Sequence, residues 1–187
     1  MFVGYGAFYT YVTPYLLLLF PSIDVAMSLI LFLLGISSFI GNLIGGYASD
    51  HIGYAKSLLI GAVLQMVSML LIFVSQPIEW LSVLFAILWL MSAWFTGLQL
   101  NTGIAQVTQN KSSFMISINM SSIQLGGAIG SSLAAVVITL SGIQNIVFIA
   151  LLTSLGIILI QFISNKKYSS THSIGMRESN DTVAQEV

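Results

Sequence analysis

An acid and a base stand close together between two apolar stretches of this chain, in the segment GGYASDHIGYAK at residues 45–56. Its framework is Gly46, Asp50, Gly53 and Lys56. We expect Asp50 near the start of the following helix, where free N–H groups and the positive end of the helix dipole favour a carboxylate. Gly53 permits a sharp turn. Lys56 can pair with a carboxylate or with an anionic lipid head group. An ordinary polar turn is the alternative explanation.

Neutral polar and aromatic side chains recur at helical spacing in three of the apolar stretches. Residues three or four apart share one face of a helix. Polar groups that face lipid cost free energy, so these faces should point into a bundle. There they either line a cavity or form hydrogen bonds between helices. Each such hydrogen bond stabilises the bundle by about 0.6 kcal/mol. Such groups suit a sugar, a nucleoside or a neutral drug-like substrate. The candidate cavity residues are Tyr5, Tyr9, Trp89, Ser92, Thr96, Gln99 and Asn119.

Two pairs of glycines lie four residues apart and therefore also share helix faces. They are Gly41 with Gly45, and Gly126 with Gly130. Missing side chains let two helix backbones approach closely, which is a common packing device in membranes. Tight helix packing is the simpler interpretation, and gliding contacts between moving helices are the other.

Several classes of function are excluded by what the apolar stretches lack. They contain no Asp, Glu, Lys, Arg or His, so a self-contained proton pump is disfavoured. The chain has no cysteine and no phosphate-binding glycine loop, and we expect no metal, no cofactor and no catalytic residues. We do not expect an enzyme. A net charge of −1 gives no reason to expect nucleic acid as a partner.

The helices that hold these residues are predicted from an unusually apolar composition. Hydrophobic residues make up 57% of the 187 and charged residues only 6%, against about 25% charged in soluble domains. Lipid is the consistent solvent, and mean hydropathy is +0.98. A transmembrane helix needs about 20 mostly apolar residues. The predicted bundle covers residues 1–164, with spans at about 2–20, 25–47, 57–75, 80–101, 114–140 and 144–164.

The basic residues predict how these spans are oriented. Lys56 and Lys111 fall in alternate connections, and the remaining basic residues fall in a polar segment at 165–187, which we expect to be a disordered cytoplasmic tail. The opposite connections carry only Asp24 and Glu79. The positive-inside rule then places both ends of the chain in the cytoplasm, in a multi-pass protein of the plasma or inner membrane.

The segment with Gly46, Asp50, Gly53 and Lys56 resembles the loop motif of the major facilitator superfamily, Gly-x3-Asp-x2-Gly followed by basic residues. Further stretches resemble the drug–proton antiporter branch, especially sugar-efflux and arabinose-efflux-like permeases. Residues 9–16 resemble that branch's seventh helix, residues 32–50 its eighth and residues 117–138 its eleventh.

The resemblance covers about residues 1–165 and aligns with helices seven to twelve of a twelve-helix fold. It implies an all-α membrane protein that forms the C-terminal half of a major-facilitator fold, from a truncated or split gene. It also implies alternating access around a site shared with a second six-helix half. Any proton coupling would then come from that other half. The alternative is a membrane interaction protein, or a gene remnant, that does not transport.

Overall fold

The computed structural model describes residues 1–75, 78–107 and 113–163. These residues form helices joined by short connections, with no strand among them. Five helices are long and apolar enough to cross a membrane, and a bent helix pair near the N-terminus supplies a sixth span. The prediction of an all-α membrane protein with six transmembrane helices is confirmed. The tail at 165–187 lies outside the described residues, as does Lys111.

The first span is broken, which corrects the prediction of one uninterrupted helix at 2–20. It consists of α1 (Phe2–Tyr9) and α2 (Val12–Leu19), which meet at 47°. Pro14 explains the break. It has no backbone N–H to bond the carbonyl of Thr10, and its ring crowds that carbonyl. The helix therefore stops at Thr10 and restarts.

The remaining helices overlap the predicted spans, and several of them run further. A short 3-10 helix η1 (Pro21–Ala26) leads into α3. The long helices are α3 (Met27–Ile52), α4 (Tyr54–Val74), α5 (Glu79–Val107) and α6 (Ser113–Ser141), and a 3-10 turn η2 (Ile143–Asn145) opens the last span, Ile143–Ile163. Polar residues just outside the apolar stretches continue α3 and α5 because a helix bonds its own backbone groups.

The connection between α3 and α4 is a single residue and not a polar loop. Gly53 has a φ of +82°, a left-handed conformation that glycine adopts without strain. Its N–H donates to the carbonyl of Ser49, and its own carbonyl accepts from Ser57. Asp50 consequently lies in the last turn of α3 and not at the start of α4, which corrects the expectation for its carboxylate.

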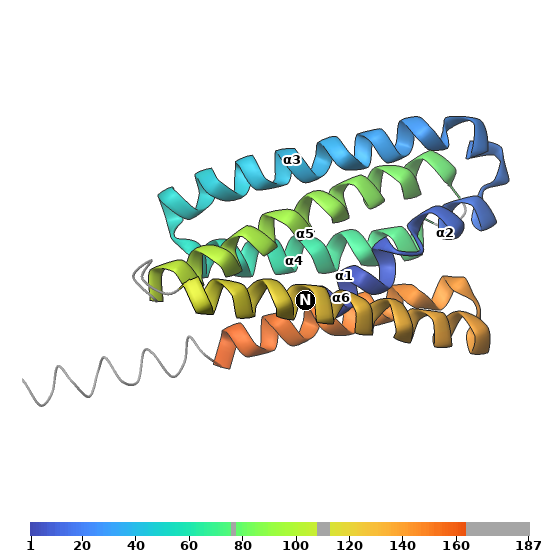
Figure 1. Cartoon of the computed structure of the whole chain (residues 1–187). Helices are drawn as coiled ribbons and strands as arrows, with labels where there is room; N and C mark the ends of the chain where they lie inside the picture. Colours follow the sequence, from blue (N-terminus) through green and yellow to red (C-terminus); the bar gives the residue numbers. More distant parts are fainter. Residues whose placement is uncertain (76–77, 108–112, 164–187) are drawn as a thin grey trace, which may run out of the picture.

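Helix α5 lies between α3 and α4 and packs closely against both (Figure 1). It runs parallel to α3, with Gly41 against Met91 and Gly45 against Phe95. It runs antiparallel to α4, where the hydroxyls of Ser75 and Ser82 lie 3.0 Å apart. Helix α4 is nearly as buried as α5, because its small and polar face covers α5.

A second packing unit brings α1 against α6 and the last span. Gly6 of α1 faces the backbone of Gly127, and Gly130 faces the carbonyl of Val3. Apart from these contacts α6 is the most exposed of the long helices, with only Gly130 and Ala134 fully buried. Much of the surface of α6 therefore faces away from the bundle.

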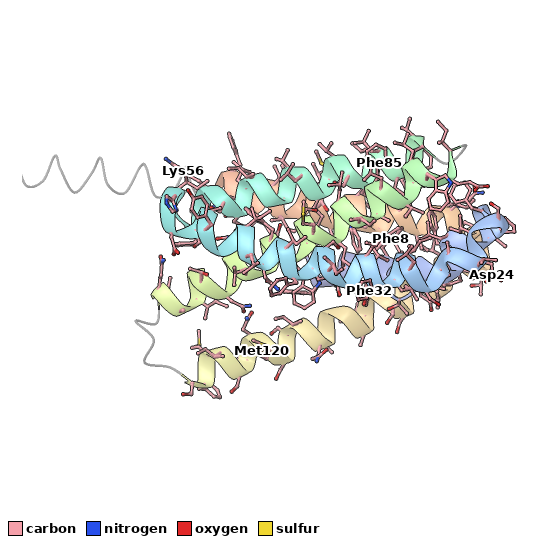
Figure 2. The ribbon with its side chains drawn as sticks, turned by 90° about the horizontal axis from the view of Figure 1, so that it is seen from above. Phe8, Asp24, Phe32, Lys56, Phe85 and Met120 are labelled. Carbon is pink, nitrogen blue, oxygen red and sulfur yellow. The ribbon has the colours of Figure 1, made fainter. Side chains whose placement is uncertain are left out.

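The two ends of the bundle differ in charge. Figure 2 shows Lys56 and Asp24 at opposite ends. At the Asp24 end, the hydroxyl of Ser22 donates to the carboxylate of Glu79 and joins η1 to α5. At the Lys56 end, the amide of Gln161 donates to the carbonyl of Ala55 at 3.1 Å and joins the last span to α4.

Candidate functional site

Helix α5 presents two different faces to its neighbours, and only one of them borders a central cavity. Successive residues turn by about 100° around a helix. Ser92, Thr96 and Gln99 therefore lie on roughly the opposite side of α5 from Trp94 and Asn101. The face with Ser92, Thr96 and Gln99 is the one that the sequence predicted to line a cavity.

The predicted polar face of α5 is buried against α3 and α4. Ser92 donates to the carbonyl of Trp89, and Thr96 to the carbonyl of Ser92, both at 2.7 Å and within the same helix. The Gln99 amide donates to the carbonyl of Gly45 at 2.8 Å, which links α5 to α3. These side chains are 0–3% exposed, so they bond inside the bundle and do not line the central cavity.

The opposite face borders a cavity of about 200 Å³ between α1, α3, α5 and α6. Its walls are mainly apolar and carry no charged side chain, and Asn42 and Asn101 bring amide groups into it. A small, mostly apolar cavity with a few convergent polar groups is typical of a small-molecule site. The lining residues are Met1, Phe2, Tyr5, Asn42, Ala93, Trp94, Gly97, Leu98, Asn101, Met120 and Ile123.

Tyr5 is the centre of an aromatic cluster beside this cavity. Its ring stacks on Tyr9 with centroids 5.0 Å apart, and on Trp89 with centroids 6.0 Å apart. Trp94 meets the same ring edge-on at 6.2 Å. Trp89 is only 1% exposed, while Tyr9 and Trp94 are 46% and 41% exposed. Trp89 therefore supports the cluster from behind, and the other rings offer surfaces for stacking.

Asn119 reaches the cavity region through one hydrogen bond. Its side-chain amide donates to the side-chain oxygen of Asn101 at 2.6 Å, joining α6 to α5. This bond holds an amide pair at the cavity wall, where unused donor and acceptor positions can face a bound molecule. Of the seven predicted cavity residues, the structure brings Tyr5, Tyr9, Trp89 and Asn119 to this region.

Trp94, Asn101, Asn42 and Met120 line the cavity but were not among the predicted site residues. Trp94 and Asn101 lie seven residues apart on α5, and this helical spacing was a usable signal. Ser92, Thr96 and Gln99 form a longer row of polar residues at helical spacing, so the prediction selected their face of α5.

Four buried polar atoms lack a hydrogen-bond partner within the described part of the chain. They are Ser57 Oγ, Gln65 Oε1, Trp89 Nε1 and Gln99 Oε1. All four belong to α4 and α5, the two helices that pack antiparallel. An unpaired buried polar atom is costly, by about 1–3 kcal/mol each. Close packing must therefore outweigh these unpaired polar atoms in holding α4 and α5 in the bundle.

The residues of the Gly46–Lys56 motif lie at the end of the bundle, away from the cavity. Gly46 is half-buried near Leu98, with ordinary space for a side chain. Asp50 and Lys56 are exposed. Neither forms an ion pair with another described residue, and no three described His, Asp or Glu side chains group into a metal-binding set.

A bundle of apolar spanning helices with a neutral cavity beside its central helix defines a multi-pass membrane protein. Comparison with known proteins gives the family. The sequence profile of the Major Facilitator Superfamily matches residues 1–183. The chain is also similar to the uncharacterized MFS-type transporter YbcL of Bacillus subtilis (strain 168), with 30% identity over 150 residues, which are 80% of this chain and 38% of that relative. The chain belongs to the Major Facilitator Superfamily.

Proposed function

We propose that this chain forms the C-terminal half of a secondary transporter that exports small neutral or drug-like solutes by alternating access. The cavity between α1, α3, α5 and α6 carries the proposal. Its lining combines aromatic rings with amide groups and includes no charged side chain. Aromatic faces and neutral hydrogen-bonding groups favour planar or hydroxylated neutral molecules over ions. The resemblance to drug and sugar efflux permeases supports the same direction of transport.

A second six-helix unit is the proposed partner. Helix α6 borders the cavity and is the most exposed long helix. Its exposed face carries Ser121 and Gln124, and such polar side chains are costly against lipid tails. A partner half packed on this face would cover them and close the other side of the cavity. The chain spans 38% of the length of its Bacillus relative.

The proposed location is the cell membrane, with both ends of the chain in the cytoplasm. Lys56 marks one end of the bundle, and Asp24 marks the other (Figure 2). All other Lys and Arg residues belong to connections or segments predicted on the Lys56 side. The positive-inside rule assigns that side to the cytoplasm.

Transport by reconstituted vesicles tests this proposal. The full chain would be reconstituted alone, and also after co-expression with the N-terminal six helices of a family member. We expect export of a neutral fluorescent dye only from vesicles that contain both halves. Robust transport by this chain alone would overturn the half-transporter assignment. No transport in either preparation, together with stable binding to another membrane protein, would favour the non-transporting interaction protein.

A further inference from the structure

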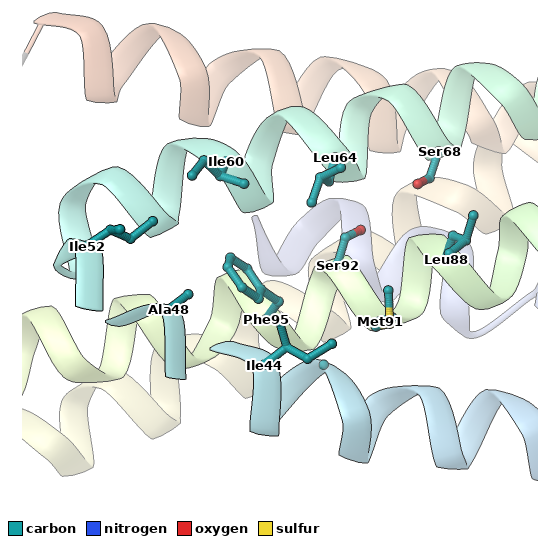
Figure 3. A pocket seen from close by; sticks show the side chains of 11 residues that line it. Ile44, Ala48, Ile52, Ile60, Leu64, Ser68, Leu88, Met91, Ser92 and Phe95 are labelled. Atoms are coloured by element: carbon teal, nitrogen blue, oxygen red, sulfur yellow. The ribbon is translucent and has the colours of Figure 1, made fainter. Parts of the chain in front are cut away.

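A narrow apolar groove runs between α3 and α4, on a different side of α5 from the central cavity (Figure 3). Its volume is about 330 Å³. Side chains of α5 lie between the two walls, and Ser68 and Ser92 supply the only polar side chains. The walls are formed by Gly41, Ile44, Ala48 and Ile52 of α3 and by Ile60 and Leu64 of α4.

The groove opens toward the outside of the bundle. Ile44 and Leu64 are each 49% exposed and Ile60 is 44% exposed, so their side chains form a rim against the surroundings. Helices α3 and α4 each pack on α5 but touch one another little, which leaves the space between them open. In a membrane-spanning protein the medium at such a rim is the lipid tails.

The length of the groove matches one leaflet of a bilayer. From Ile52 beside the α3–α4 turn to Gly41, α3 advances eleven residues, or about 16 Å at 1.5 Å per residue. The hydrocarbon core of a bilayer is about 30 Å thick. The groove therefore extends from the end of the bundle to about the midplane, which is the depth that one acyl chain occupies.

A positive charge stands at the outer end of this groove. Lys56 precedes Ile60 by four residues, and Ile60 precedes Leu64 by four, so all three lie along one face of α4. Lys56 is exposed and forms no ion pair with any described residue. The first turn of α4 also has no side-chain cap, which leaves its backbone N–H groups available to an anion.

Neither His51 nor Asp50, the other charged or titratable groups of α3 at this end, pairs with Lys56, so an external anion can bind there. The His51 ring stacks on Tyr47 and bonds the Tyr47 carbonyl at 2.8 Å. Asp50 is exposed in the last turn of α3, and two residues from both Ala48 and Ile52 it stands on roughly the opposite side of that helix from the groove wall. Lys56 is thus the cation on the groove-facing stripe of α4.

We propose that this groove binds a single membrane phospholipid, with one acyl chain between α3 and α4 and its phosphate at Lys56 and the first turn of α4. This site is separate from the solute cavity, and the proposal does not depend on transport. It assigns Lys56 a lipid-binding role.

Photo-crosslinking in nanodiscs tests the proposal on the full chain. The probe is a phosphatidylglycerol with a diazirine at the end of one acyl chain, and adducts are mapped by peptide mass spectrometry. We expect adducts to concentrate at the deep end of the groove, near Gly41 and Ser68. Lys56→Gln should reduce them about five-fold, because one lysine at an anionic head group contributes about that factor. Lys56→Arg keeps the positive charge at the same position and should leave them nearly unchanged.

A second pair of variants tests the acyl-chain part. Ile60→Trp fills the groove and should remove the adducts, whereas Val63→Trp, at a similarly exposed position of α4 that does not line the groove, should not. Adducts spread evenly over the lipid-facing helices, or unchanged in Ile60→Trp, would overturn the site. Adducts unchanged in Lys56→Gln, or equally strong with a diazirine diacylglycerol that lacks phosphate, would overturn the head-group assignment and with it the proposal.

Discussion

The side-chain amide of Gln99 donates a 2.8 Å hydrogen bond to the backbone carbonyl of Gly45, and this bond joins the parallel helices α5 and α3. The bond exists because Gly45 has no side chain to hold the helices apart. A Cβ there would lie 3.3 Å from the Gln99 amide nitrogen and from the Phe95 backbone. The contact between these helices should therefore respond in a graded way to added methyl groups.

Alanine substitutions along α3 should destabilise the bundle in the order of the space available. In Gly41→Ala the methyl would overlap the carbonyl oxygen of Met91, so we expect a loss of about 1–3 kcal/mol in unfolding free energy. Gly45→Ala should lose less. Gly35→Ala is the control, because its Cβ meets nothing within 4 Å. It should be neutral or stabilising by up to about 1 kcal/mol. Unfolding in a detergent titration measures the order, and equal effects at Gly41 and Gly35 would contradict it.

Where Gly6 of α1 meets Gly127 of α6, the contact should be sensitive to a methyl group on Gly6 and not to one on Gly127. In Gly6→Ala the methyl would overlap the backbone of Gly127, and the helices would have to separate. In Gly127→Ala the methyl would point into open space. We expect a lower unfolding midpoint for Gly6→Ala and little change for Gly127→Ala in the same titration. Similar losses in both variants would show that the two helices cross differently.

Substitutions on the two faces of α5 should separate solute binding from packing. Trp94→Leu and Asn101→Leu alter the central cavity, and each should weaken solute binding by about two- to ten-fold through a lost ring or amide contact. Thr96→Val removes a buried hydroxyl that bonds only its own helix, so solute binding should stay nearly unchanged. The affinity for a neutral fluorescent solute is measured on each variant after co-expression with an N-terminal half. The cavity assignment fails if Thr96→Val has the larger effect.

Restoring a backbone N–H donor at position 14 should join α1 and α2 into one continuous helix. Pro14→Ala supplies an N–H that can bond the Thr10 carbonyl, so amide hydrogen exchange over residues 10–14 should slow several-fold. Pro21→Ala is the matched control. Pro21 stands in the first turn of η1, where a helix has no use for that N–H, and exchange should not change. Unaltered exchange in Pro14→Ala would show that other contacts set the 47° bend.

Labelling of single cysteines should reveal the orientation of the bundle, because the chain contains no cysteine of its own. Val25 is 98% exposed at the Asp24 end, and His51 is exposed at the Lys56 end. In intact cells an impermeant maleimide should react with Val25→Cys and should not react with His51→Cys until the membrane is opened. The reverse pattern would place the Lys56 end outside the cell.

Apolar composition and helix length were enough to predict the class of protein and all six spans, because lipid admits few structures other than helices. The motif with Asp50 and Lys56 was enough to predict the superfamily. The break at Thr10 could also have been inferred, since Pro14 lies in the first span and its local effect does not depend on packing. Only the tertiary structure assigned the faces of α5. Ser92 and Thr96 satisfy their hydroxyls on their own helix, so their spacing carries no information about what they face. Trp94 and Asn101 border the cavity because α1 and α6 pack beyond them, and that arrangement depends on glycine contacts between helices distant in sequence.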